Sequence, residues 1–336
     1  MNTRKISIAF QTNKNPAEYI ALAKLVNHFD FDIVSVYCDA PFHPSYGPLL
    51  LMAPYLDHAM VGPAAVSPFR MHPIDIAANT ALLASVVGER VYVGITRGAW
   101  LEDYGIQEPA KPILGIREAV MVIHRLLSGG TAGFDGRVFK IADHVRAPYP
   151  VPKAKIPIMI GTWGPKMATL AGKIADEVKV GGSTNPAVAR KILGYINRGC
   201  SEAGRAMNTV GLAMGAVTVV DDDRKTARLI AKNEIALYLP VVAKLDPTEN
   251  LEPELVARIK TYVEQGDVQS AAGLIEDDLL EKFAFAGNEN DIVRQAEALF
   301  QKGVSRVEFG TPHGITPETG IRILGERVIP RLRGYS

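Results

Sequence analysis

Short apolar runs alternate with longer amphipathic stretches along most of the chain. Short runs bounded by turn residues are typical of buried strands, whereas apolar residues three and four positions apart are typical of helices. The pattern predicts eight strands, at residues 6–10, 31–37, 58–61, 90–96, 156–160, 177–180, 209–220 and 304–309. It predicts intervening helices at residues 16–28, 49–56, 74–87, 115–127, 165–174, 186–203, 224–237, 292–302 and 317–332. This alternation favours an α/β chain folded as a (β/α)8 TIM barrel with insertions.

Two segments depart from the repeat. Residues 101–149 hold a polar connector, one amphipathic helix and short β-like pieces with a proline-rich tail, which we interpret as an insertion. Residues 239–282 predict helical pieces at 254–264 and 268–282, which we interpret as a helical cap, with a lid or a dimer surface as alternatives. No flexible linker divides the chain, so residues 1–336 are expected to form a single domain.

A predicted β-α-β unit at residues 156–186 carries two glycine-containing turns, at 161–164 and 181–183. Parallel strands joined by one helix point the same way, so both turns lie at the same end of the sheet. Helices then begin near Pro165 and Pro186, and helix N-termini offer unpaired N–H groups to anions. The unit is therefore consistent with a phosphate site. The alternative is that the glycines serve only close packing of helix against strand.

Composition narrows the possible partners. Lys plus Arg number 37 and Asp plus Glu 36, so charge gives no case for nucleic acid or an anionic membrane surface. The two cysteines, Cys38 and Cys200, are far apart and lack metal-type spacing, as expected of a reduced cytoplasmic protein. No apolar stretch reaches the length of a membrane span.

The carboxyl ends of the predicted strands are the places to look for chemistry in such a barrel. No histidines or carboxylates there have a metal-ligand spacing, so no metal site is predicted. A glycosidase needs two opposed carboxylates, and only Asp39 clearly qualifies, with Asp221 as a weaker second. The remaining mouth is apolar and rich in glycine, and suits a planar cofactor that brings its own chemistry.

Several of these side chains also have a purely structural interpretation. Asp39 could only cap a turn, and Arg97 could form an ion pair with Glu102 or Asp103. Trp163 and Trp100 follow strand ends, where an aromatic ring packs either a ligand or the core. We interpret His43 and His72 as loop histidines with local hydrogen bonds.

Six segments, taken in order, resemble the luciferase-like superfamily of flavin and deazaflavin oxidoreductases, in particular its coenzyme F420-dependent branch. They are Val61-Gly-Pro-Ala-Ala-Val-Ser-Pro with His72-Pro73, Gly94-Ile-Thr-Arg-Gly, Phe134-Asp-Gly-Arg-Val-Phe, Ile156-Pro-Ile-Met-Ile-Gly-Thr-Trp-Gly-Pro, Ala175-Asp176, and residues 303–314 with Gly310-Thr-Pro-His-Gly. The resemblance covers nearly the whole chain. It implies a TIM barrel that binds coenzyme F420, transfers a hydride to or from a small organic substrate, and forms a homodimer.

The resemblance also implies roles for individual residues. A non-prolyl cis peptide bond, here Ala64–Ala65, is expected behind the central cofactor ring. The residues expected to bind the cofactor are Asp39, Ala64, Ala65, Val66, Thr162, Gly164, Pro165, Gly181, Gly182 and Ser183. Asp39 and Gln11 are the catalytic candidates, and the substrate candidates are Tyr37, His43, Arg97 and Trp163. The methylenetetrahydromethanopterin reductases of this family have a carboxylate at the end of the first strand, where this chain has Ala9 and Gln11.

Two other functions remain open from the sequence. With the same fold, flavin mononucleotide (FMN) in place of F420 would give a monooxygenase that uses reduced flavin and dioxygen. A barrel that only stores or senses the cofactor is the second alternative, which loss of the first-strand carboxylate would permit.

Overall fold

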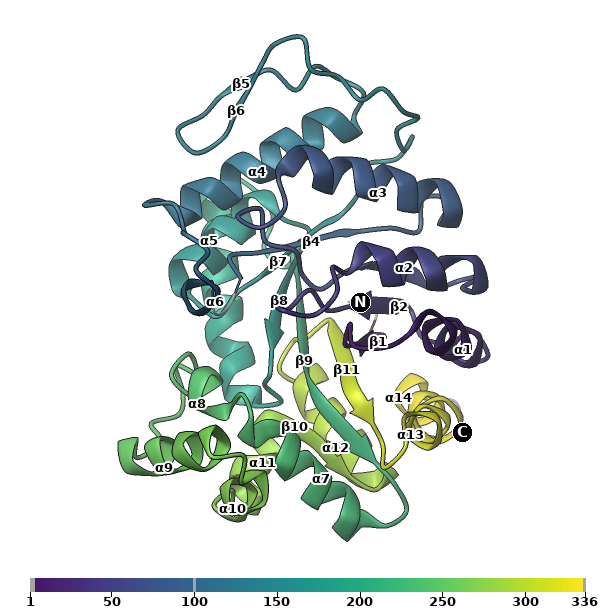
Figure 1. Ribbon diagram of the computed structural model, residues 1–336, viewed down its shortest axis with the longest axis vertical. Coiled ribbons are helices and arrows are strands. Elements are labelled where there is room, and N and C mark those ends of the chain that lie inside the picture. The colour runs from purple at the N-terminus through teal and green to yellow at the C-terminus, as the bar shows by residue number, and fades with distance from the viewer. Residues whose placement is uncertain (1–3, 99–100, 335–336) are drawn as a thin grey trace.

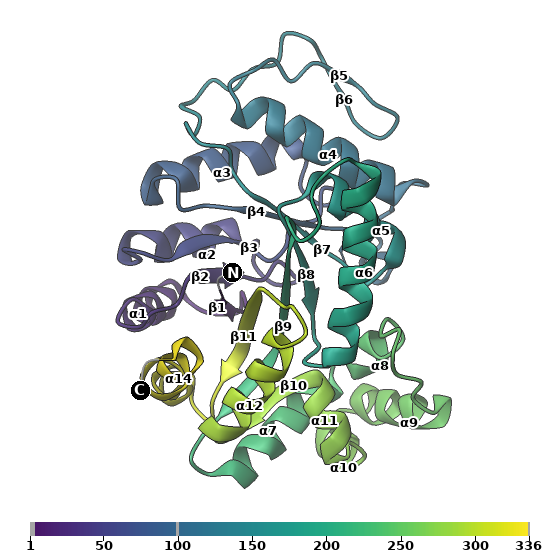
Figure 2. The same ribbon diagram turned by 180° about the vertical axis from the view of Figure 1, so that it is seen from behind.

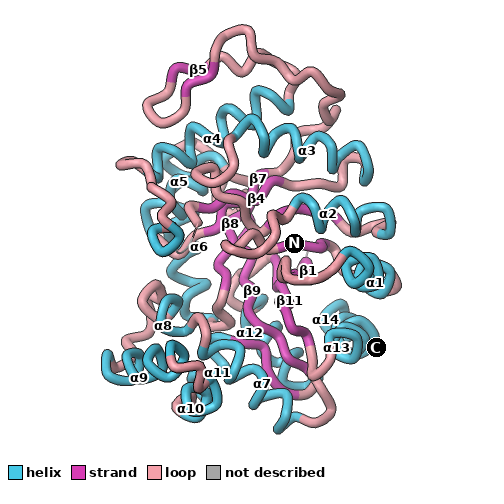
Figure 3. The backbone as a smooth tube through the Cα atoms, in the orientation of Figure 1, coloured by secondary structure: helices cyan, strands magenta, loops and turns pink. Residues whose placement is uncertain are grey.

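Eight parallel strands form the barrel of the computed structural model, which describes residues 4–98 and 101–334 (Figures 1 and 3). The sheet order is β3-β2-β1-β11-β9-β8-β7-β4, and the bridges Val61–Val91 and Val66–Ile95 connect the third strand to the fourth. The barrel strands are β1 (Lys5–Phe10), β2 (Ile33–Val36), β3 (Met60–Pro63), β4 (Val93–Thr96), β7 (Ile158–Gly161), β8 (Glu177–Gly181), β9 (Gly211–Val220) and β11 (Arg306–His313). Each lies within or beside a predicted strand, and the TIM-barrel prediction is confirmed.

Helices surround the strands, and most begin at a proline. Proline suits the first helical position because its missing N–H would have no partner there. The helices around the barrel are α1 (Pro16–Val26), α2 (Tyr46–Met52), α3 (Pro73–Val87), α4 (Pro112–Leu127), α5 (Pro165–Ile174), α6 (Pro186–Glu202), α7 (Arg224–Ala236), α12 (Glu289–Phe300), α13 (Pro317–Ile323) and α14 (Ile329–Arg333). A π-helical turn, Leu324–Val328, joins the last two, and short 3-10 turns lie at Ala53–Tyr55 and Glu102–Tyr104. Asn15 and Asn288 close capping boxes at α1 and α12.

One wall of the barrel continues beyond the mouth. The first half of β9 pairs with β8 up to Gly215, and its second half pairs with β10 (Ala284–Gly287), while β11 follows it to His313. The sequence analysis missed β10, because a four-residue run with two alanines has little strand propensity. Helix α7 packs on β9 and β10.

The segment 239–282 is helical and packs around α7 (Figure 1). It contains α8 (Leu239–Val242), α9 (Pro253–Glu264), α10 (Val268–Gly273) and α11 (Asp277–Phe283). The single helix predicted over 268–282 is thus two helices, broken near Gly273. A hydrophobic cluster separate from the barrel core holds these helices together, with Ile259, Leu280 and Phe283 fully buried. We call this segment the helical cap.

A small hairpin, β5 (Phe134–Asp135) with β6 (Lys140–Ile141), lies beyond α4 at the outside of the molecule (Figure 2). The buried carboxylate of Glu118 on α4 accepts hydrogen bonds from the N–H groups of Arg137, Val138 and Phe139, at 2.9, 2.8 and 2.9 Å. One acidic side chain therefore anchors the hairpin tip to the helix.

Replacing Glu118 with alanine should release this hairpin. Three N–H groups, of which that of Phe139 is buried, would lose their acceptor, and hydrogen bonds to a charged group contribute roughly 1.5–3 kcal/mol each before relaxation. We expect faster amide hydrogen exchange at residues 137–139 and a lower melting temperature. Asp135→Asn is the control, because the ion pair of Asp135 with Lys140 is exposed on both sides and contributes little. Unchanged exchange in Glu118→Ala would contradict this anchoring role.

No helix among residues 4–98 and 101–334 combines the length and apolar character that crossing a bilayer requires.

Candidate active site

Gln11 and Asp39 meet at the carboxyl ends of β1 and β2. The Gln11 amide donates from Nε2 to Asp39 Oδ2 at 3.1 Å, while its Oε1 accepts from the Thr12 N–H at 2.8 Å. The Gln11 N–H in turn donates to Thr311 Oγ1 at 3.2 Å. The side-chain contacts fix the orientation of the Gln11 amide group. The two residues predicted as catalytic, Gln11 and Asp39, therefore form one hydrogen-bonded pair.

The segment Ala64–Val66 lies between β2 and β4, and its Ala64–Ala65 peptide bond is cis. The Ala64 N–H donates to Val36 O at 2.8 Å, and the Val66 N–H donates to Gly94 O at 2.9 Å. Both ends of the segment are therefore fixed by neighbouring strands. Ala64 and Ala65 stay half-exposed, as a surface that receives a ligand requires.

The floor of the mouth is formed by Tyr37 above buried charges. The Lys179 ammonium lies 5.0 Å from the centroid of the Tyr37 ring and pairs with Glu308 inside the barrel. The Tyr37 hydroxyl lies against Gly310, where a Cβ would approach it to 2.4 Å. The tyrosine ring therefore separates the barrel interior from the site above it.

The charges below Tyr37 form a continuous ladder along the barrel interior. Arg306 donates to Glu308 Oε2 at 2.8 Å and to Glu177 Oε1 at 3.0 Å, and Ser35 Oγ donates to Glu308 Oε2 at 2.8 Å. The side chains of Arg306 and Glu308 are fully buried, and that of Lys179 is 7% exposed. We call Lys179, Glu308, Arg306 and Glu177 the charge ladder.

The ladder shifts the pKa values of its members and of Tyr37. Burial alone would raise the pKa of Glu308, but the Lys179 and Arg306 cations outweigh it and lower that pKa to about 2. Burial lowers the pKa of Lys179, against the opposing effect of Glu308. Burial, followed by the charges of Glu308 and Asp39, raises the pKa of Tyr37 well above its ordinary value. Tyr37 therefore stays a neutral phenol.

The N-terminus of α5 has open N–H groups. The Gly164 N–H donates to Thr162 Oγ1 at 3.0 Å, and no side chain caps the helix. Within the described ranges, the N–H groups of Lys166 and Met167 have no acceptor in the protein. Two free donors at the positive end of a ten-residue helix suit an anion such as a phosphate.

The turn after β8 differs from the one before α5. The N–H groups of Gly182 and Ser183 both point at Gly215 O, at 2.6 and 3.3 Å, and the Thr184 N–H donates to Lys282 O at 2.9 Å. Helix α6 is also capped, because the Asn185 side chain accepts from its first turn. Of the two helix starts predicted to share an anion, the one at Pro165 thus keeps its donors free. The buried side chain of Ser183 serves the turn itself.

Trp163 connects these two turns. Its indole Nε1 donates to Gly181 O at 3.0 Å, and its half-buried ring packs against both the barrel core and the cluster of the helical cap. The side chain therefore lies where strand ends and cap meet.

The other predicted substrate residues are more peripheral. Arg97 is exposed and pairs with Glu108, not with Glu102 or Asp103 as the sequence suggested. His43 is exposed, and its backbone N–H donates to Thr12 O. Trp100 lies outside the described residues.

Two structural interpretations hold. His72 caps α3, its Nδ1 accepting from the Ile74 N–H at 3.3 Å. Asp221 accepts from the Asp223 N–H, and Asp223 caps α7 as the acidic run predicted.

The sequence analysis missed the charge ladder and Tyr238. The sequence does contain a signal for the charge ladder. Two pairs of charged residues stand two positions apart in buried strands, and this spacing puts both members of a pair on the inward face: Glu177 with Lys179, and Arg306 with Glu308. Tyr238 follows α7 and reaches the mouth from the cap, with its Oη donating to Phe283 O at 3.0 Å. Its position depends on the extended wall, and nothing in the local sequence indicates it.

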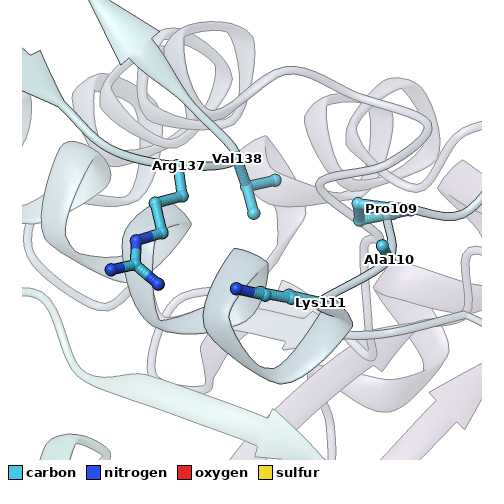
Figure 4. A pocket seen from close by; sticks show the side chains of 5 residues that line it. All are labelled: Pro109, Ala110, Lys111, Arg137 and Val138. Carbon is cyan, nitrogen blue, oxygen red and sulfur yellow. The ribbon is translucent and has the colours of Figure 1, made fainter.

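Two cavities lie away from the strand ends. One of about 340 Å³ lies between Pro109–Lys111 and the tip of the β5–β6 hairpin, with Lys111 and Arg137 on its rim (Figure 4). Another of about 380 Å³ lies near the amino ends of the strands, beside Val210 and Gly303. Because neither contains the convergent polar groups at the strand ends, we define the site by those groups. In the part of the chain that the structure describes, no cluster of His, Cys, Asp and Glu is arranged to hold a metal ion.

The sequence profile of the luciferase-like monooxygenase family matches residues 17–306. The chain belongs to this family. Among its relatives, the 5,10-methylenetetrahydromethanopterin reductase of Methanopyrus kandleri is 29% identical over 95% of each chain. The F420-dependent glucose-6-phosphate dehydrogenase of Microbacterium testaceum is 26% identical over 82% of this chain and 79% of its own.

Solved structures agree with the sequence relatives. The coenzyme F420-dependent tetrahydromethanopterin reductase of Methanopyrus kandleri superposes with a TM-score of 0.90, at 26% identity over 98% of this chain and 99% of its own. An F420-dependent secondary alcohol dehydrogenase has the same fold, with a TM-score of 0.78 at 20% identity over 98% and 99% of the two chains. The predicted family is confirmed.

Proposed function

We propose that this chain is a coenzyme F420-dependent oxidoreductase that transfers a hydride between the deazaflavin ring and a small organic substrate. The observation that carries the proposal is the open N-terminus of α5, which lies at the same barrel mouth as the Ala64–Val66 segment and the Gln11–Asp39 pair. Relatives named as F420-dependent, which match over 82% and 98% of this chain, support the choice of cofactor.

The residues at the mouth fit such a group. The free N–H groups of Lys166 and Met167 would hold a phosphate, and Ala64 to Val66 would support one face of a planar ring. When bound, the coenzyme supplies or accepts the hydride. The protein fixes the geometry, because hydrogen bonds within the chain hold Gln11 and Ala64 in place.

The face opposite Ala64–Val66 is left for the substrate. Tyr37 and Trp163 offer aromatic surface there, while His43 and Arg97 lie on exposed loops at the rim. Asp39 would direct a proton or a hydrogen bond through its contact with Gln11. We also propose that the chain works as a cytoplasmic homodimer, for which light scattering of the purified protein is the check.

Equilibrium binding tests the cofactor assignment. Apoprotein is titrated with F420 and, in parallel, with FMN, and the fluorescence of each ligand is followed. Tight binding of F420 alone supports the proposal. Preference for FMN would move the protein to the monooxygenase side of the family, and binding of neither would overturn the proposal. Hydride transfer to any acceptor would exclude a barrel that only stores or senses the cofactor.

Trp163→Ala should weaken substrate more than cofactor. The indole is bonded to Gly181 O and makes no hydrogen bond to the free N–H groups of α5, so its loss should act mainly on substrate and raise KM roughly tenfold, which corresponds to about 1.4 kcal/mol. The acceptor is 5,10-methylenetetrahydromethanopterin, and fluorescence gives the Kd for F420. Trp163→Phe is the matched control, because it keeps an aromatic ring and removes only the hydrogen bond to Gly181. Equal losses of substrate and cofactor affinity would contradict the assignment of Trp163 to the substrate side of the site.

A further inference from the structure

The cavity of about 340 Å³ beside the β5–β6 hairpin presents two cations to one space. Pro109, Ala110 and Lys111 line it from the loop that leads into α4, and Arg137 and Val138 line it from the hairpin tip. The side chains of Lys111 and Arg137 both extend toward the space between these two segments (Figure 4). Small-molecule pockets hold roughly 300–1,000 Å³, so the cavity is large enough for a small ligand.

The backbone that carries the two cations is fixed by hydrogen bonds. Glu118 on α4 accepts from the N–H groups of Arg137 and Val138, at 2.9 and 2.8 Å. On the opposite wall, Lys111 is the N-cap residue of α4, and its carbonyl accepts from the Gly115 N–H at 3.0 Å. Both walls are therefore attached to the same helix, and a ligand would not have to order either of them on binding.

The cavity borders the loops that follow β3 and β4. A Cβ on Gly115 would lie 3.3 Å from Val138 Cγ1 and 2.8 Å from the ring of Phe69, in the loop after β3. Glu108, which precedes the lining segment, pairs with Arg97 directly after β4. A ligand in the cavity would therefore lie outside the barrel mouth, next to two of the loops that surround it.

Neither cation has a counter-charge. Among residues 4–98 and 101–334, no side chain forms an ion pair or a hydrogen bond with the side chain of Lys111 or Arg137. The acidic side chains of the adjoining segments have other partners: Glu108 pairs with Arg97, Asp135 with Lys140, and Glu118 accepts from backbone N–H groups. The cavity thus keeps two positive charges that the described chain does not neutralise.

Helix α4 adds to the positive potential of the cavity. The helix has 16 residues and begins directly after Lys111, with no side-chain cap and no acidic residue in its first turn. In the part of the chain that the structure describes, the N–H groups of Ile113 and Leu114 have no acceptor. The positive end of the helix dipole therefore acts on the same region as the two side chains.

We propose that this cavity binds an oxyanion, a phosphate or carboxylate group, carried by a small molecule. The Arg137 guanidinium presents its N–H groups in a fork that matches two oxygens of such a group, and the Lys111 ammonium adds a point charge. The same two charges repel a metal cation. This site goes beyond the proposed function, because it requires neither F420 nor hydride transfer.

Hydrogen exchange followed by mass spectrometry tests the site locally. Apoprotein is incubated with inorganic phosphate or, separately, with citrate, and compared with sodium chloride at equal ionic strength. In wild type, at least one of the two anions should slow exchange in peptides that cover residues 109–115, where the N–H groups of Ile113 and Leu114 gain an acceptor. Half of the effect should be reached on the order of 1 mM, the Kd of a weak small-molecule contact. The anion with the stronger effect identifies the group that the ligand carries.

Substitutions assign the effect to the two cations. Lys111→Gln combined with Arg137→Gln should raise the half-effect concentration at least roughly tenfold. Lys140→Gln is the matched control and should leave it unchanged, because Lys140 is on the same hairpin, pairs with Asp135 and does not line the cavity. Peptides that cover residues 164–168 report the proposed phosphate site at α5 in the same samples, so the two sites are measured separately.

Circular dichroism without added anion checks that the variants are folded, and the two single substitutions replace the double variant if it is not. No slowing in wild type with either anion would overturn the proposal. Equal slowing in wild type and in the variant without the two cations, or an equal loss in Lys140→Gln, would also overturn it.

Discussion

Replacing Glu308 with glutamine should destabilise the protein by roughly 3–5 kcal/mol, because the change leaves the buried Lys179 cation without its counter-charge and Arg306 with Glu177 alone. Glu308 is fully buried and is the shared partner of Lys179 and Arg306. A loss of this size lowers the melting temperature by on the order of 10 °C in a chain of this length. Thermal and urea unfolding of wild type and variant measure it. Glu318→Gln is the matched control, because Glu318 pairs with Arg322 on an exposed helix face.

A double variant separates charge from packing. Lys179→Met with Glu308→Leu removes both charges and fills the space with apolar groups, so it should recover part of the stability lost in Glu308→Gln. If Glu308→Gln were as mild as Glu318→Gln, the charge ladder would not stabilise the barrel.

The same residue gives a pH dependence of known sign. The pKa of Glu308 is lowered from 4.5 to about 2 in the folded chain. Its contribution to the free energy of unfolding is therefore fully present above about pH 5 and is lost as the pH falls towards 2. Wild-type stability should fall more steeply than that of Glu308→Gln across this window.

The charge ladder shows which structural feature the sequence pattern does not predict, namely the pairing of residues on different strands. Apolar runs located all eight barrel strands because burial on both faces leaves few polar positions, and helix starts were marked by prolines and caps. Glu177, Lys179, Arg306 and Glu308 have the sequence spacing of inward-facing residues. Their mutual pairing, however, depends on the order of strands around the barrel, which the local pattern does not contain.

The outline of the site was also predictable, because functional residues of such a barrel lie at the carboxyl ends of its strands. Strand ends identified Gln11 and Asp39 separately, and the barrel brings them within one hydrogen bond. Whether the N–H groups of the turn after β8 stay free was not predictable, because the Thr184 N–H donates to Lys282 O, about a hundred residues later in the chain. Long-range acceptors of this kind decide which helix start keeps free donors. Glycine content alone gives no indication of them.

Gly94→Ala should disrupt both the barrel and the cofactor site. A Cβ at Gly94 would lie 2.0 Å from Pro63 O and 2.8 Å from Met159 Cε, and a backbone oxygen cannot yield as a flexible side chain can. Gly94 O also accepts the hydrogen bond from the Val66 N–H, so a shift of β4 displaces the segment that is proposed to support the ring. We expect a stability loss of roughly 3 kcal/mol, at the upper end of what overpacking costs.

Gly194 provides the control with the opposite sign. It is exposed in α6, no atom lies within 4 Å of a Cβ placed there, and alanine in a helix interior is favoured over glycine by about 0.5–1 kcal/mol. Gly194→Ala should therefore raise the melting temperature slightly and leave F420 binding unchanged. At a temperature where both variants are folded, by circular dichroism, Gly94→Ala should bind F420 at least roughly tenfold more weakly than wild type, a loss of about 1.4 kcal/mol. Full affinity in a folded Gly94→Ala protein would mean that the ring does not rest on Ala64–Val66.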